Sequence, residues 1–302
     1  MIGSTGFVGR ATAAHLRERG RTVIGTSTTG EGADLACDIR DPRAVDRAIT
    51  GADPGSIVLV AGLASIPGSW EDPDAAFRVN TGGAFNVLDG MRRLAPGAHL
   101  LVASSAGVYG PPASSGDMPY TEDMPMRAVS PYAASKAATE VLCRQFAAQR
   151  GLGIAVCRIF NQVGPGQNAA QAPAEFSQEI VRAERRGDRV LRLRVGNPAI
   201  ERDFTDVRDS ARAFGELIDA GATGTFNVCS GTGTSLAKIV EILASNTAVE
   251  VEIVTDPDRS PQGDILRVYG SNDRLREAIG WRPEVPLERS LADLLDDWRS
   301  RE

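Results

Sequence analysis

Residues 3–9 of the chain read Gly3-Ser4-Thr5-Gly6-Phe7-Val8-Gly9 and lead directly into a helical pattern that extends from Val8 to about Arg19. Glycine at the first, fourth and seventh places allows a tight turn, close approach of the backbone to a pyrophosphate, and packing of the helix on its strand. The amino end of that helix would offer free N–H groups to the anion. The same spacing also fits an ordinary turn between a strand and a helix, so its meaning depends on the rest of the chain.

Apolar runs typical of strands alternate with helical patterns through the first half of the chain. The runs cover residues 21–26, 56–61, 99–104 and 153–159, and the two longest helical patterns cover 73–94 and 131–150. This alternation predicts an α/β fold with a Rossmann-type, doubly wound parallel sheet. Only two residues precede Gly3, whereas a strand normally has about five or six. We therefore expect that N-terminal residues are missing from the first strand.

Beyond Phe160 the chain becomes richer in glycine and proline loops. Helical patterns follow at 174–186, 234–245 and 287–299, with an alternating strand pattern at 249–254. These segments predict a smaller C-terminal α/β lobe with loops suited to closing over a ligand. We expect residues 1–160 to form the core, residues 203–220 to return to it, and the remainder of 161–302 to form mainly the smaller lobe.

The composition argues against several classes of function. The 302 residues are 42% hydrophobic and carry a formal net charge of −6, which disfavours a nucleic-acid partner. No apolar run approaches the roughly 18 residues of a membrane span, and no signal peptide is recognisable, so we expect a cytoplasmic protein with no membrane partner. The four cysteines lack CxxC spacing and only two histidines occur, so we expect buried cysteines and no metal site.

The segment after the second strand bears on the choice of coenzyme. An acidic residue commonly binds the adenosine ribose there, but this chain has Thr26, Ser27 and Thr28. The lack of a carboxylate favours NADP(H) over NAD(H), although no arginine is adjacent to pair with a 2′-phosphate. Asp38 could contact the adenine, or could serve only as a turn residue before Pro42.

A tyrosine and a lysine lie one helical turn apart in Ser130-Pro131-Tyr132-Ala133-Ala134-Ser135-Lys136. The Lys136 ammonium is expected to lower the pKa of the Tyr132 phenol and to bind the nicotinamide ribose. About 27 residues earlier, a strand pattern ends in Ser104 and Ser105, and a hydroxyl there could hydrogen-bond a substrate carbonyl. We choose Ser105 for this role; alternatively, both serines merely end the strand.

Together with their order, these motifs resemble the extended short-chain dehydrogenase/reductases. The resemblance is carried by GSTGFVG, SSAGVYG, SPYAASK and RIFNQVGPGQ, with SW-EDP and FRVN between the first two. The C-terminal pieces GNPAIERDFTDVRDSARAF, TFNVCSG and AIGWRPEVPLERSLADLLDDW are similar to those of GDP-4-dehydro-6-deoxy-D-mannose reductases and their relatives. The resemblance covers nearly the whole chain.

The resemblance implies a Rossmann core that binds NAD(P) and a lobe that binds a nucleotide sugar, with Tyr132, Lys136 and Ser105 as the catalytic residues. It implies coenzyme contacts from Gly3, Thr5, Gly6, Phe7, Val8, Gly9, Thr26, Ser27, Asp38, Ile39, Ala61, Asn80, Ser104, Tyr132 and Lys136. It implies substrate contacts from Ser105, Ala106, Tyr132, Asn161, Arg202 and Arg259. For Arg202 the alternative is an ion pair with Asp203 or Asp206.

Two departures from the family pattern bear on the reaction and the substrate. Related dehydratases carry acidic residues after the catalytic serine or threonine, where this chain has Ala106 and Gly107, so elimination of water lacks a proton-transfer group. Pro261 stands where the family has an arginine that binds the diphosphate, although Arg259 is two residues away and could replace it. The nucleotide and the sugar therefore stay open.

Three functions remain in view. The first is reduction at C4 of a nucleotide-linked 4-keto-6-deoxyhexose by NAD(P)H, with Tyr132 as proton donor. The second is a nucleotide-sugar 4-epimerase that retains NAD. A non-catalytic dinucleotide sensor is disfavoured because Tyr132 and Lys136 are both present. The two long helical patterns resemble the pair that forms a four-helix dimer interface in the family, which implies a homodimer.

Overall fold

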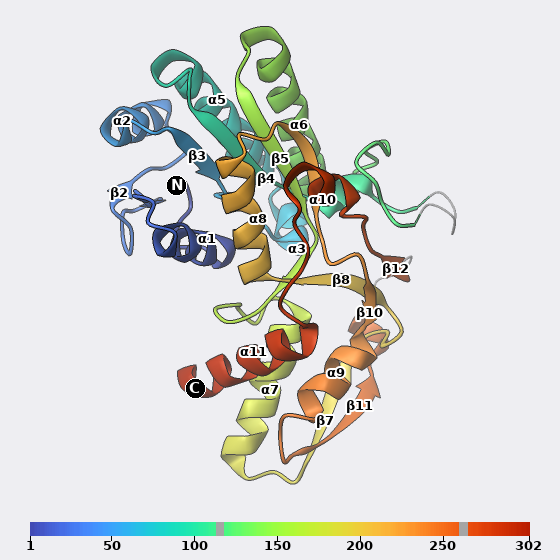
Figure 1. Ribbon diagram of the computed structural model, residues 1–302. Coiled ribbons are helices and arrows are strands. Elements are labelled where there is room, and N and C mark those ends of the chain that lie inside the picture. The colour runs from blue at the N-terminus through green and yellow to red at the C-terminus, as the bar shows by residue number, and fades with distance from the viewer. Residues whose placement is uncertain (113–117, 260–264) are drawn as a thin grey trace.

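The computed structural model describes residues 1–112, 118–259 and 265–302, and shows a core built on a parallel sheet with a smaller lobe beside it (Figure 1). The sheet has the order β3-β4-β5-β9, and every neighbouring pair in it is parallel. Its strands are β3 (Ser56–Leu59), β4 (His99–Ser105), β5 (Gly153–Ile159) and β9 (Gly224–Val228). Ile2 bridges Leu59 on one side and Thr26 on the other, which joins β1 (Thr26–Ser27) and β2 (Leu35–Ala36) to the same layer.

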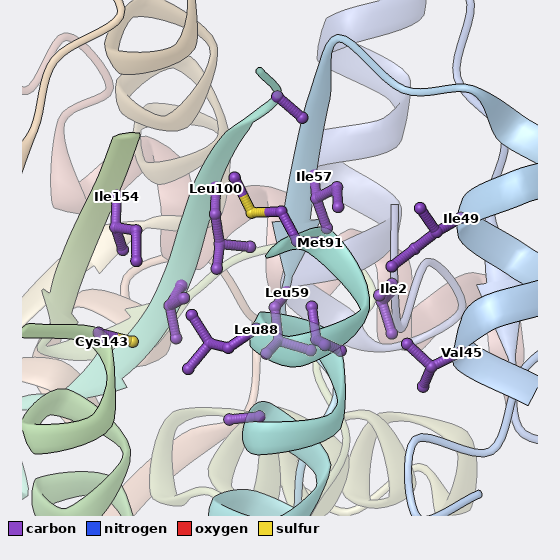
Figure 2. Close-up of a cluster of buried hydrophobic side chains, with 14 of the residues drawn as sticks. Ile2, Val45, Ile49, Ile57, Leu59, Leu88, Met91, Leu100, Cys143 and Ile154 are labelled. Atoms are coloured by element: carbon purple, nitrogen blue, oxygen red, sulfur yellow. The ribbon is translucent and has the colours of Figure 1, made fainter. Parts of the chain in front are cut away.

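Helices cover both faces of this sheet. The core helices are α1 (Phe7–Glu18), α2 (Pro42–Ala52), α5 (Gly83–Leu94), α6 (Pro131–Arg150) and α8 (Val207–Asp219). Side chains from α2, α5 and α6 pack on one face with Ile57, Leu100 and Ile154 (Figure 2). On β4, Leu100 and Leu101 belong to clusters on opposite faces, as the alternation of side chains along a strand requires. The Rossmann-type doubly wound fold is confirmed.

The lobe forms a second hydrophobic cluster under its own helices, α7 (Ala172–Arg186), α9 (Leu236–Ala244) and α11 (Leu287–Arg301). Strand β8 (Glu201–Asp206) pairs with β6 (Asn161–Val163), β10 (Gly233–Ser235) and β12 (Arg267–Val268). Strands β7 (Val190–Val195) and β11 (Glu250–Thr255) form a separate parallel pair. Besides α8, strand β9 and helix α10 (Asp273–Ile279) also pack on the core, although they lie beyond residue 160.

Two elements differ from the sequence-based expectation. The run at 21–26 gives only the two-residue strand β1, and Ile2 contributes isolated bridges to Thr26 and Leu59. The pattern at 73–94 is divided into α4 (Pro73–Ala76), a π-helical stretch η1 (Phe77–Gly82) and α5. Short helices α3 (Ile66–Glu71), η2 (Ala106–Tyr109) and η4 (Pro257–Arg259) complete the described elements.

The four cysteines are all buried and free of disulfides, as the sequence predicts. Burial raises the pKa of the Cys143 thiol to about 12, so that thiol stays neutral near pH 7. Within the described residues, no helix is both long and apolar enough to cross a membrane.

Candidate active site

The glycine turn has no room for side chains. Gly3 adopts a φ of +91°, and a Cβ there would lie 2.6 Å from the Ala61 nitrogen. A Cβ on Gly9 would lie 2.1 Å from the carbonyl oxygen of Gly3. Gly6 is the N-cap of α1 and no side chain caps this helix end, so its first N–H groups remain available to an anion. The turn therefore fits a dinucleotide pyrophosphate.

The candidate coenzyme residues lie at one edge of the sheet. Thr26 and Ser27 form β1, Ala61 follows β3, and Ser104 and Ser105 end β4. Ligands of open parallel sheets bind outside the carboxyl ends of the strands. The topology therefore gathers residues that are widely separated in sequence beside the glycine turn.

Asp38 and Ile39 follow β2 and have partners within the chain. Asp38 accepts hydrogen bonds from the Arg40 backbone N–H at 3.0 Å and from Arg40 Nη2 at 2.6 Å, and the Arg40 guanidinium lowers the pKa of the Asp38 carboxyl. This is the turn arrangement that the sequence left open. Ile39 is buried, and its carbonyl accepts a bond from Asn86. Contact of either residue with a coenzyme stays a prediction.

Asn80 lies in the π-helical stretch η1, a distortion that often marks functional positions. Its Oδ1 accepts from the Leu63 N–H at 2.8 Å, and its Nδ2 donates to Ser135 Oγ at 2.9 Å. A Cβ on Gly62 would lie 2.7 Å from Asn80 Oδ1 and 3.5 Å from Lys136 Nζ. Asn80 thus ties the loop after β3 to α6, and Gly62 keeps the space beside Lys136 open.

Tyr132, Lys136 and Ser105 are brought together at the start of α6. Ser130 caps this helix by accepting from the Ala133 N–H at 3.1 Å, which places Tyr132 in the first turn. The Ser105 hydroxyl lies close enough to the Tyr132 phenol to lower the pKa of that phenol. Lys136 Nζ donates to the carbonyl oxygen of Ala103 at 2.8 Å, just before the serines.

The protonation of these groups follows from their burial. Burial raises the pKa of Tyr132, and the nearby Ser105 hydroxyl opposes that change only in part. The sequence suggested that Lys136 lowers the pKa of Tyr132, but without a coenzyme the pKa of Tyr132 is raised. Burial lowers the pKa of Lys136 to about 8. At neutral pH the phenol is protonated and suited to donate a proton.

The two serines have different partners. Ser105 Oγ accepts from the Gly107 N–H at 3.1 Å and meets Tyr132. Ser104 is 1% exposed, and its hydroxyl donates to Glu140 Oε1 at 2.6 Å. Of the two, we keep Ser105 as the candidate for contact with substrate.

The candidate substrate residues are more dispersed. Ala106 begins η2 beside Ser105, and Asn161 is exposed at the start of β6. Arg202 on β8 donates from Nη1 to the carbonyl oxygens of Glu201 at 2.9 Å and Ile265 at 2.7 Å. Arg259 on η4 donates to Glu175 at 2.5 Å in the lobe.

The two acids considered as alternatives for Arg202 have other partners. Asp203 accepts from the backbone N–H groups of Ser230, Gly231 and Gly270, and Asp206 pairs with Arg208. Pro261 lies outside the described residues.

Arg10 is a residue that the sequence did not single out. Its guanidinium donates to the carbonyl oxygen of Thr5 at 2.6 Å and to that of Gly166 at 3.1 Å. It thereby joins the glycine turn to the loop after β6. Its position directly after Gly9 was visible in the sequence, but Gly166 is 156 residues away, so its partner was not.

Comparison with known proteins agrees with this geometry. The NAD dependent epimerase/dehydratase family matches residues 1–229. GDP-6-deoxy-D-mannose reductase of Pseudomonas aeruginosa is 36% identical over 249 residues, which are 82% of this chain and 81% of the relative. UDP-glucose 4-epimerase of Mycolicibacterium smegmatis is 28% identical over 100% of this chain and 98% of the relative.

Solved structures show the same likeness. RMD from Pseudomonas aeruginosa complexed with NADPH superposes with a TM-score of 0.88 at 31% identity, covering 100% of this chain and 98% of that one. UDP-glucose 4-epimerase from Thermus thermophilus complexed with NAD gives a TM-score of 0.85 at 28% identity, with 100% and 98% covered. The matched family and the assembled site lead to one conclusion: this chain is an enzyme of the NAD dependent epimerase/dehydratase family.

Proposed function

We propose that this enzyme uses NAD(P)H to reduce a nucleotide-linked 4-keto-6-deoxyhexose, similar to GDP-4-dehydro-6-deoxy-D-mannose, to the 4-hydroxy sugar. The proposal is carried by the contact between Ser105 and a protonated Tyr132, with Ala106 and Gly107 following the serine. This arrangement can donate one proton, whereas the two side chains after Ser105 cannot remove one for elimination of water. The likeness to the Pseudomonas aeruginosa reductase supports the same reaction.

Each catalytic side chain has a distinct task in this reaction. When bound, the coenzyme supplies hydride to C4 of the sugar. Ser105 hydrogen-bonds the C4 carbonyl oxygen and holds it beside Tyr132, whose phenol donates its proton to that oxygen. Lys136, as an ammonium, stabilises the negative charge that develops on the phenol oxygen. Asn80 holds α6 at the correct distance through Ser135.

We assign the nucleotide-sugar site mainly to residues 161–302. Arg202 and Arg259 provide guanidinium groups, which suit a diphosphate because they can bind two oxygens at once. Asn161 is exposed and lies two residues after the carboxyl end of β5. Ser105 also lies at the carboxyl end of its strand, β4, which pairs with β5. The resemblance to nucleotide-sugar enzymes supports these three roles.

We propose NADP(H) as the preferred coenzyme. Thr26 and Ser27 leave no carboxylate in β1 to repel a 2′-phosphate. A cavity of about 380 Å³ beside the glycine turn is lined by Ser4, Arg10, Arg17 and Gly32, together with Ala13, Ala14, Ala33 and Asp34. Arg10 and Arg17 thus lie near the turn, although the sequence around residue 26 has no arginine, and the Asp34 carboxylate of the same cavity lies 3.5 Å from Arg17 Nη2. The NADPH complex of the Pseudomonas aeruginosa neighbour supports this preference.

The second candidate is a nucleotide-sugar 4-epimerase with tightly bound NAD, and the epimerase relatives that cover the whole chain favour it. We expect the purified protein to consume external NADPH faster than NADH when given one of the GDP-, dTDP- or UDP-linked 4-keto sugars. Coenzyme oxidation followed at 340 nm and chromatography of the products test this. Stoichiometric NAD in the purified protein, with interconversion of two sugars and no need for external coenzyme, would contradict the reductase.

We also propose a homodimer formed through α5 and α6. Phe85 on α5 is 47% exposed and Val141 on α6 is 51% exposed, so each of the two helices that the resemblance assigns to the interface has an uncovered large apolar side chain. We expect a light-scattering mass near twice 31.9 kDa, and a mass near 31.9 kDa for the Val141→Arg variant. Val190→Arg in the lobe, where Val190 is 44% exposed, is the matched control and should stay dimeric. A monomeric wild type would contradict the proposal.

A further inference from the structure

A buried carboxylate shares the catalytic face of α6. Tyr132, Lys136 and Glu140 are spaced four residues apart, so they lie on one side of the helix. The proposed reaction uses the first two, whereas Glu140 is 1% exposed and points to other parts of the core. A charge held so deep must be paired, and its partners show what it does.

Glu140 joins α6 to two strands. Arg158 on β5 binds it with both ends of the guanidinium, Nε to Oε1 at 3.0 Å and Nη2 to Oε2 at 2.8 Å. Ser104 on β4 donates to Oε1 at 2.6 Å. Ser104 and Arg158 are direct partners in the parallel pairing of β4 with β5. The Glu140 carboxylate thus connects α6, the helix that carries Tyr132, to paired residues of the adjacent strands β4 and β5.

Arg158 extends this connection towards η2. Its Nη1 donates to the carbonyl oxygen of Glu122 at 3.1 Å, and its guanidinium lies 4.7 Å from the centre of the Tyr109 ring. Tyr109 ends η2, which begins directly after Ser105. The buried Glu140–Arg158 ion pair therefore contacts Ser104 before Ser105 and Tyr109 after it.

We propose that Ser104, Glu140 and Arg158 form a buried positioning set that fixes Ser105 relative to Tyr132. The inference rests on the proposed function, because it assigns that pair to proton transfer. Ser104 precedes Ser105 directly, so holding its hydroxyl fixes the end of β4. Glu140 lies two turns from Tyr132, so holding its carboxylate fixes the rotation of α6. A misplacement of about 1 Å between reacting groups can lower the rate by about 10²-fold.

Stability alone does not account for this arrangement. Buried ion pairs lose much of their attraction to the cost of removing two charges from water, and apolar residues of similar size often serve as well. A paired charge does give a fixed geometry, because the guanidinium and the carboxylate meet in one plane. The position of the pair directly behind Ser105 and Lys136 is where such a geometry matters for the reaction.

The charge of Glu140 also reaches Lys136. Burial lowers the pKa of Lys136, while Cys143 and Glu140 on the same helix act to raise it. The other groups around it are the Tyr132 phenol one turn away and, on β4, the carbonyl oxygen of Ala103. Arg158 faces Glu140 from β5. Because the Cys143 thiol is neutral below its pKa of about 12, loss of the Glu140 carboxylate should lower the pKa of Lys136 further.

Two variants test the positioning set. Ser104→Ala removes one hydroxyl, and Glu140→Met/Arg158→Met removes the pair together, so that no unpaired charge is left buried to prevent folding. Ser177→Ala is the matched control, since Ser177 is also fully buried and donates to the Pro173 carbonyl oxygen at 2.8 Å in the lobe. Each variant is compared with wild type for melting temperature, Kd of NADPH, kcat, KM and the pH profile of kcat/KM.

We expect kcat to fall about 10-fold in Ser104→Ala and about 10²-fold in the double variant, with KM and the Kd of NADPH nearly unchanged. In a third variant, Glu140→Gln, which removes only the negative charge, the alkaline limb of the profile, near pH 8 in wild type, should move to lower pH. Ser177→Ala should keep the wild-type kcat and profile. Wild-type kcat in the folded Ser104→Ala and double variants would overturn the inference.

A direct titration keeps this test separate from the proposed function. The chain has two lysines, Lys136 and Lys238, so nuclear magnetic resonance of protein labelled at lysine gives two ammonium signals to follow with pH. We expect the Lys136 signal to titrate near pH 8 in wild type and lower in Glu140→Gln, which loses the carboxylate charge. An unchanged midpoint would overturn the inference even if the substrate differs from a 4-keto sugar. A wild type that turns over no nucleotide sugar would contradict the proposed function alone.

Discussion

Tyr132→Phe is expected to lower kcat by about 10²–10⁴-fold, because the variant lacks the phenol that protonates the C4 oxygen. The ring of phenylalanine occupies nearly the same space, and Lys136 keeps its bond to the Ala103 carbonyl oxygen at 2.8 Å. The Kd of NADPH should therefore change little. Steady-state kinetics and fluorescence titration of the coenzyme measure the two quantities on the same preparation.

A lower kcat with an unchanged Kd of NADPH in Tyr132→Phe would assign the phenol to proton transfer and not to coenzyme binding. The raised pKa of Tyr132 means that wild type holds its proton across the neutral range, so its rate should not depend on this group titrating there. Turnover equal to wild type in Tyr132→Phe would show that another group supplies the proton. Loss of coenzyme binding together with turnover would indicate that the phenol serves binding instead.

Gly9→Ala is expected to destabilise the fold and abolish coenzyme binding. The new Cβ would lie 2.1 Å from the carbonyl oxygen of Gly3, and that oxygen belongs to backbone, which cannot rotate away as a side chain could. Overpacking of this kind costs about 1–3 kcal/mol, and relief of the clash would push the turn away from the start of α1. Thermal unfolding and NADPH titration measure the two effects.

Gly51→Ala is the matched control for that substitution. Gly51 also lies in a helix, α2, but a Cβ there meets nothing within 4 Å. Replacing an unstrained helical glycine by alanine stabilises a protein by about 0.5–1 kcal/mol. The two variants should therefore shift the melting temperature in opposite directions. A Gly9→Ala protein that is as stable as wild type and binds NADPH normally would contradict the role of the glycine turn.

Much of the fold could be predicted because it depends on local patterns. The alternation of apolar residues located β4, β5, β11 and the long helix α6 within a few residues, since side-chain burial repeats with the period of each element. The π-helical stretch at Asn80 and the bonds of this residue to Leu63 and Ser135 could not be predicted, because those partners are distant in sequence. The two-residue length of β1 likewise could not be predicted, because it depends on pairing with Leu35 and Ala36 of β2.

For the candidate site, the sequence by itself determined the chemical groups: the glycine turn, the Ser105 hydroxyl, and Tyr132 and Lys136 one helical turn apart. Spacing along one helix or one turn is a local property, so it can be read before the chain is folded. The tertiary structure alone decided that burial raises the pKa of Tyr132, that Ser104 turns to Glu140, and that Arg10 reaches Gly166. Desolvation and hydrogen bonds between distant segments arise only when the strands and helices pack together, which is why the sequence could name the reacting groups but not their protonation or their supports.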